Sequence, residues 1–175
     1  MKFYNDTNAT TPDATIAGLR ALSSLNSSFK KGGARVGEGG GFQNPSPHQN
    51  EVLPLKKGEL RNIILIMGGT DKGLDMSKLV AEIPKHCKGV VFLKESGIEK
   101  LLSEFPLIKG GEARLRAGDV VLKDFLKGCV EEAVKIAKKG DIVLFSPAFA
   151  SFGKWFKNEY DRGEQFARLI DELEP

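Results

Sequence analysis

Three short polar segments of the sequence carry the side chains that could do chemistry. The first follows a short apolar stretch and reads Asn5-Asp6-Thr7-Asn8-Ala9-Thr10. The Asp6 carboxylate can accept hydrogen bonds from two hydroxyl groups, as from a ribose, and the Thr10 hydroxyl can donate to a carboxylate near a helix N-terminus. Asparagine, aspartate and threonine also cap helices and form turns, so this segment alone is compatible with a structural role.

The second segment is rich in glycine and contains one lysine, in the order Gly68-Gly69-Thr70-Asp71-Lys72-Gly73. Paired glycines permit a close approach of the backbone to another group. Lys72 supplies a mobile positive charge that suits a carboxylate or a phosphate. A glycine turn with a solvated lysine explains the same residues, and this segment alone does not decide between the two.

The third segment combines small and hydroxyl-bearing residues after an apolar run, from Phe145 to Gly153. Such residues leave room for a ligand and offer it hydrogen-bond donors. Ser146 is not expected to be a nucleophile, because no G-x-S-x-G pattern surrounds it. The two histidines, His48 and His86, are expected to be solvated rather than catalytic, and the sequence indicates no catalytic residue and no metal ligand.

Strands and helices alternate along the chain, which predicts how these segments are placed. The predicted strands are the opening Phe3-Tyr4-Asn5 stretch, 62–67, 89–93 and 141–145. The predicted helices begin with Thr11 as N-cap or span 75–83, 98–105, 122–138 (with Phe125, Cys129, Ala133 and Ile136 on one face) and the C-terminal residues. This alternation predicts a single α/β domain with a mostly parallel sheet and helices on both faces. The carboxyl ends of parallel strands share one edge, so all three segments should lie together.

Composition excludes several functional classes. The 175 residues suit one domain, and a net charge of +3 is too small to indicate nucleic acid or an anionic membrane as partner. No apolar run approaches the ~20 residues of a membrane span. Two cysteines without metal-type spacing favour a reduced, cytoplasmic context. Residues 26–61 are rich in glycine and polar residues, and they predict a disordered insertion rather than a phosphate loop.

Taken together and in this order, the three segments resemble the C-terminal domain of the Mur ligases, and in particular of the D-glutamate-adding members. The resemblance rests on 5–12, 68–73, 146–152 and 156–163, and it covers nearly the whole chain apart from the insertion. It implies a Rossmann-like domain that closes over a central ATPase domain. It also implies ATP-dependent ligation of an amino acid to a nucleotide-linked carboxylate in peptidoglycan synthesis.

The resemblance assigns roles to individual residues. Asp6 would hold the ATP ribose, with Asn8 at a position where the family usually has a lysine. The D-glutamate site would be formed by Thr10, Lys72, Ser151 and Phe152. The segment from Ser151 to Arg162 is one residue longer than the commonest pattern. Either Glu159 or Tyr160 would therefore occupy the last substrate-contact position.

The sequence contains no G-x-x-x-x-G-K-[ST] phosphate loop. ATP and Mg²⁺ would therefore be bound by the complete enzyme, with central and N-terminal domains supplied in cis or in trans, and the isolated chain is expected to be inactive. Three interpretations stay open: a domain or split-gene piece of a D-glutamate ligase, a stand-alone binding module of the same fold, and a domain of a related ligase similar to folylpolyglutamate synthase. The order of the motifs favours the first. Met1 is either a natural start or a domain boundary.

Overall fold

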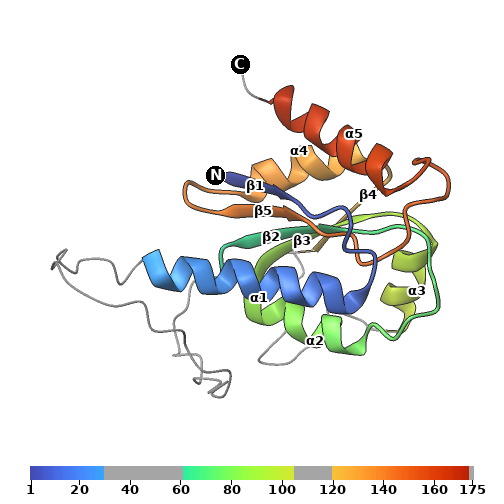
Figure 1. Cartoon of the computed structure of the whole chain (residues 1–175), viewed down its shortest axis with the longest axis horizontal. Coiled ribbons are helices and arrows are strands. Elements are labelled where there is room, and N and C mark those ends of the chain that lie inside the picture. The colour runs from blue at the N-terminus through green and yellow to red at the C-terminus, as the bar shows by residue number, and fades with distance from the viewer. Residues whose placement is uncertain (30–60, 105–119, 174–175) are drawn as a thin grey trace, which may run out of the picture.

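Parallel strands and connecting helices build the domain (Figure 1). The computed structural model describes residues 1–29, 61–104 and 120–173. In this part of the chain the strands are β1 (Lys2–Asn5), β2 (Ile63–Met67), β3 (Cys87–Leu93), β4 (Val120–Lys123) and β5 (Ile142–Phe145). They pair in the order β1-β5-β2-β3-β4, and every pair is parallel. The helices between and after them are α1 (Pro12–Phe29), α2 (Ser77–His86), α3 (Ser96–Glu104), α4 (Leu126–Ile136) and α5 (Glu159–Asp171). The predicted α/β, Rossmann-like class is confirmed.

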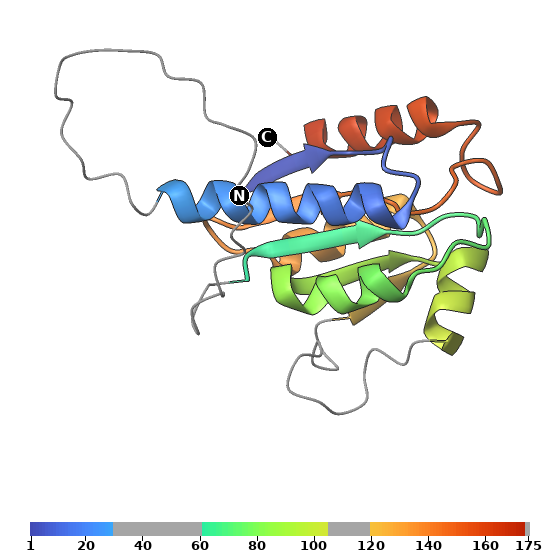
Figure 2. The same ribbon diagram turned by 60° about the horizontal axis from the view of Figure 1, so that its bottom comes forward.

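The sheet is covered on both faces, as the continuous apolar run of β2 requires. All five residues of β2 are fully buried, and successive side chains of a strand point to opposite faces. Leu65 packs into a core cluster with residues of α1 and α2, and Ile66 packs into a second cluster with residues of α4 and α5. Figure 2 shows the sheet between these two helix pairs, with α3 at its carboxyl end. The predicted three-layer arrangement is confirmed.

The start of α1 agrees with the sequence. The Thr11 hydroxyl accepts a hydrogen bond from the Ala14 backbone N–H at 3.3 Å, so Thr11 caps the helix as predicted. The helix continues to Phe29 and includes residues 26–29, where the predicted insertion begins. Residues 30–60, which make up almost all of that predicted segment and include His48, lie outside the described residues.

The prediction of one helix over 122–138 is wrong at its N-terminal end. Residues Val120–Lys123 form the edge strand β4, which pairs with β3, and α4 begins only at Leu126. Phe125 has an extended backbone and its side chain is 57% exposed, so it does not share the buried face of Cys129. Pairing with β3 overrides the helical periodicity here, because the β-branched valines suit a strand equally well. None of the described helices combines the length and apolar character that a bilayer crossing requires.

Candidate functional site

The first and third polar segments meet where β1 and β5 end. Asn5 and Phe145 are register partners at the ends of these strands, and the next backbone N–H, that of Asp6, donates to the Phe145 carbonyl at 2.8 Å. Further along, the Ala148 N–H donates to the Ala9 carbonyl at 2.8 Å. Ala148 has a φ of 63°, which an alanine adopts only at some cost, and this bond helps to hold it there. The two segments therefore form one connected surface.

The glycine-rich segment joins the same surface through close backbone contacts. Gly68 and Gly69 have φ values of 147° and 152°. A Cβ at Gly68 would lie 2.4 Å from the Leu93 carbonyl oxygen, and one at Gly69 would lie 2.3 Å from the Ala150 carbonyl oxygen. Thr70 then pairs with Ala150 through two backbone hydrogen bonds of 3.0 and 3.2 Å. The glycines thus permit a close approach, as predicted, and the group that approaches is the protein's own backbone.

Asp6 is held by one carboxylate oxygen. Its Oδ2 accepts from the Ser146 hydroxyl at 3.0 Å, and that hydroxyl lies 3.0 Å from the Thr15 hydroxyl. Gly18 leaves room for this carboxylate, because a Cβ there would lie 3.2 Å from Oδ2. Partial burial raises the pKa of Asp6, and the Ser146 hydrogen bond opposes that effect. No described residue hydrogen-bonds to Oδ1, so this oxygen is available to accept from a ligand hydroxyl.

Ser151 and Glu159 are in direct contact. The buried Ser151 hydroxyl donates to Glu159 Oε2 at 3.3 Å, and Glu159 is the first residue of α5. Tyr160 follows it and is 68% exposed. The structure thus places Glu159, and not Tyr160, beside Ser151. A hydroxyl has one proton to donate, so a ligand carboxylate at Ser151 would have to replace Glu159 as the acceptor.

The remaining predicted site residues lie at the rim of this edge. Lys72 and Asn8 are exposed, and Lys72 forms no ion pair with any residue that the structure describes. Phe152 is 63% exposed, while its carbonyl accepts from the Thr70 hydroxyl at 2.8 Å. Thr10 is partly buried, and its backbone N–H donates to the Asn8 carbonyl at 2.8 Å. Their segments are brought together, although within the described residues the side chains of Thr10, Lys72 and Ser151 are not hydrogen-bonded to one another.

Arg162 also belongs to this edge, and the sequence did not single it out for a role. It is fully buried, and its guanidinium donates to the Thr7 hydroxyl at 3.1 Å, the Thr7 carbonyl at 2.7 Å and the Phe149 carbonyl at 3.3 Å. Burial lowers the pKa of Arg162 to about 10, and the charges of Glu95 and Glu159 oppose the effect. Its position four residues before the buried Phe166 was the available signal, since residues so spaced share a helix face.

Glu95 is the second residue that the sequence analysis missed. It follows β3, and its Oε2 lies 3.4 Å from the Thr70 hydroxyl, as an alternative acceptor to the nearer Phe152 carbonyl. Its other oxygen, Oε1, is buried and has no hydrogen-bond partner among the residues that the structure describes. Burial raises the pKa of Glu95, while the Thr70 hydrogen bond and the charge of Arg162 lower it. The rule that strand ends share an edge applies to β3 as well, so the same reasoning could have found this carboxylate.

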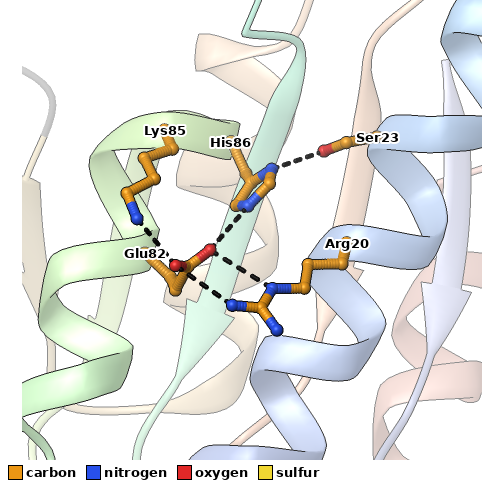
Figure 3. Close-up of polar contacts among 5 residues, drawn as sticks. All are labelled: Arg20, Ser23, Glu82, Lys85 and His86. Carbon is orange, nitrogen blue, oxygen red and sulfur yellow. Dashed lines mark hydrogen bonds and ion pairs between the residues drawn. The ribbon is translucent and has the colours of Figure 1, made fainter. Parts of the chain in front are cut away.

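A second polar cluster joins α1 to α2 (Figure 3). The Glu82 carboxylate forms ion pairs with Lys85 at 2.7 Å and with Arg20 at 3.2 Å. It also lies 3.0 Å from His86 Nε2, and His86 Nδ1 lies 2.8 Å from the Ser23 hydroxyl. The His86 side chain is only 10% exposed, so the prediction that it is solvated is wrong. The neighbouring helix supplies Ser23 and Arg20, and this tertiary contact is what covers it. In the described part of the chain, no group of three or more histidine, cysteine, aspartate or glutamate side chains is placed to hold a metal ion.

Three known proteins that are similar to this chain share one name. The UDP-N-acetylmuramoylalanine–D-glutamate ligase of Borreliella afzelii (strain PKo) is 32% identical over 173 residues, which cover 99% of this chain and 29% of the relative. The ligase of the same name from Roseiflexus sp. (strain RS-1) is 32% identical over 171 residues, 98% of this chain and 28% of the relative. The one from Bacteroides fragilis (strain YCH46) is 39% identical over 110 residues, 63% of this chain and 23% of the relative.

No family model matches the chain. The chain spans less than a third of the length of the relatives described above, and the similarity extends over almost all of this chain in two of them. The chain is therefore a domain similar to the C-terminal domain of the Mur ligases, and of the D-glutamate ligases in particular.

Proposed function

We propose that this chain supplies the amino-acid site, and part of the nucleotide site, of an ATP-dependent ligase that adds D-glutamate to UDP-N-acetylmuramoylalanine in peptidoglycan synthesis. Two observations together support the proposal. The chain is similar over nearly its whole length to proteins named for that reaction, and the segments that carry the resemblance meet at one edge of a parallel sheet. That edge is where open α/β sheets bind ligands.

The residues at this edge suit an amino dicarboxylate. Lys72 is an exposed cation without an ion-pair partner among the described residues, and it can receive one carboxylate of the substrate. Ser151 and Thr10 can donate their hydroxyl protons to a carboxylate, and the exposed ring of Phe152 can cover the carbon chain. Glu159 already accepts from Ser151, so substrate binding would exchange one carboxylate acceptor for another. In this arrangement the chain positions the attacking amine and transfers no proton itself.

The nucleotide side of the proposed site is Asp6. Its Oδ1, to which no described residue hydrogen-bonds, suits a ribose hydroxyl, and Asn8 is exposed in the same turn. ATP would supply the phosphoryl group that activates the acceptor carboxylate. We propose that the ATP phosphates and Mg²⁺ are held by the central part of the ligase and the UDP-linked substrate by its N-terminal part, with both parts supplied in cis or in trans, in the cytoplasm. The isolated chain is then inactive.

A mixing assay tests this function. The full chain is combined with the separately expressed remainder of a D-glutamate ligase, and ATP-dependent incorporation of D-glutamate into UDP-N-acetylmuramoylalanine is measured. We expect incorporation from the mixture, none from either part alone, and little with L-glutamate. Folded parts that associate without incorporating D-glutamate would reject the ligase assignment in favour of a non-catalytic module. Incorporation of L-glutamate in preference to D-glutamate would favour a ligase similar to folylpolyglutamate synthase.

A further inference from the structure

Arg162 touches both halves of the proposed site. Two of its three hydrogen bonds go to Thr7, in the turn that contains Asp6, and the third goes to Phe149, in the loop that leads to Ser151. The Thr7 hydroxyl in turn donates to the Glu159 carbonyl at 3.0 Å. The guanidinium therefore links the nucleotide side and the amino-acid side through atoms that belong to neither the sheet nor a helix interior.

The N-terminal part of α5 packs closely against the turn that contains Thr7. The Asn5 side chain donates to the Gly163 carbonyl at 2.9 Å, and a Cβ at Gly163 would lie 2.7 Å from the Thr7 methyl group. The helix that begins with Glu159 is thus seated on the Thr7 turn, with Arg162 as the buried side chain at the contact. Movement of this helix start would move Glu159 and the Thr7 turn together.

Burying an arginine side chain carries a desolvation cost that burying an apolar side chain does not. Removing a charge from water costs more than burying an apolar side chain of similar volume, so packing alone does not explain Arg162. The planar guanidinium has five N–H donors in a fixed fork, and it can bond two separate backbone segments at once in a defined geometry. The arginine therefore provides what an apolar residue lacks, a directional link between two loops.

We propose that Arg162 is a positioning residue that couples the two halves of the site, by holding the Thr7 turn at a fixed place relative to the Phe149–Ser151 loop. Order in the nucleotide half then depends on order in the amino-acid half. The ligands in this statement rest on the proposed function, whereas the coupling itself is a property of this chain alone.

The coupling is tested first on the full chain by amide hydrogen exchange. Arg162→Lys keeps the charge but lacks the planar fork, and Arg168→Lys is the matched control, since the Arg168 side chain lies on the same helix and is 72% exposed. In Arg162→Lys we expect the amides of Ala9 and Ala150 to exchange about 10-fold faster, while the amide of Leu65 in the central strand keeps its rate. The control should change none of the three. Faster exchange in only one of the two loops, or an equal change at Leu65, would overturn the coupling.

The second readout separates this inference from the proposed function. In the reconstituted ligase, Arg162→Lys should raise the KM for both ATP and D-glutamate several-fold and change kcat less, because positioning of both ligands is lost together. A rise in only one KM, with an active wild type, overturns the coupling and leaves the function standing. A wild-type mixture without ligation rejects the function, and the exchange rates then decide the coupling by themselves.

Discussion

Replacing Glu82 by glutamine removes the carboxylate at the centre of the cluster that joins α1 to α2 (Figure 3). The Glu82 side chain is 12% exposed and has three cationic or hydrogen-bonding partners, Arg20, Lys85 and His86. Burial by itself would raise the pKa of Glu82, but hydrogen bonds from Lys85, Arg20 and His86 outweigh it and lower the pKa from 4.5 to about 2. The cluster therefore stabilises the fold through the ionised form of Glu82.

The size of this stabilisation follows from the two pKa values. Each pH unit between the folded and unfolded pKa corresponds to about 1.4 kcal/mol, so the ceiling is roughly 3 kcal/mol. Arg20 and Lys85 are 64% and 47% exposed, and water screens their share. We expect Glu82→Gln to lower the free energy of unfolding by about 1–2 kcal/mol at pH 7.

The sign of the pH dependence is fixed by the direction of the shift. A folded pKa below the unfolded value gives stability that is complete above the unfolded pKa, 4.5, and is lost as the pH falls toward 2. Urea unfolding at pH 7 and at pH 3 measures this. The difference between wild type and Glu82→Gln should shrink at pH 3, because Glu82 of the unfolded chain, with a pKa of 4.5, is then mostly protonated and must lose that proton to form the cluster.

The control is Glu164→Gln, which removes an exposed carboxylate paired with Arg168 on α5; the two side chains are 67% and 72% exposed. This substitution should change the free energy of unfolding by less than about 0.5 kcal/mol at either pH. The reasoning is refuted if Glu82→Gln behaves like this control at pH 7. It is also refuted if the wild type and Glu82→Gln differ by the same amount at pH 7 and pH 3.

Three further predictions concern backbone, thiols and surface. Gly69→Ala should destabilise the fold by about 2–4 kcal/mol in thermal unfolding, because its φ is 152° and the new Cβ would meet a carbonyl oxygen. Gly73→Ala, with a φ of 72° and open space around the new Cβ, should destabilise it by only about 1 kcal/mol. Equal losses of stability would contradict the close-approach argument. Burial raises the pKa of the Cys87 thiol well above its usual range and that of Cys129 to about 12, so neither should react with a thiol reagent at pH 8 until denaturant is added, and rapid reaction of the native chain would contradict this. Phe152→Ala should change the free energy of unfolding by less than about 0.5 kcal/mol, because the ring is 63% exposed, yet raise the KM for D-glutamate in the reconstituted ligase; loss of stability without a change in KM would assign the ring to packing.

The elements that local chemistry determines were predictable from the sequence. The apolar run of β2 predicted a strand buried on both faces, and Thr11 as N-cap predicted the start of α1. Edge strand β4 was not predictable, because Val120–Lys123 takes its conformation from pairing with β3, and local periodicity there matched a helix.

The candidate site was predictable as a place and only partly as a set of contacts. Because the carboxyl ends of parallel strands share one edge, the three segments were predicted to lie together there. The backbone hydrogen bonds between the segments confirm this placement. The role of Arg162 was not predictable, because a charged residue on a helix is expected to face water. Its burial becomes evident only from the tertiary hydrogen bonds to Thr7 and Phe149. The contact between Ser151 and Glu159 depends on where α5 begins, and element boundaries are what sequence patterns define least well.

The central claim is that this edge of the sheet binds the carboxylates of D-glutamate, and the KM for D-glutamate in the reconstituted ligase tests it most directly. Lys72→Ala should raise that KM at least ~10-fold, the loss expected for one charge-assisted contact, and leave the KM for ATP unchanged. Lys78→Ala, which removes an exposed lysine from α2, should change neither value. If Lys72→Ala is indistinguishable from Lys78→Ala, the site is not at this edge and the account is wrong.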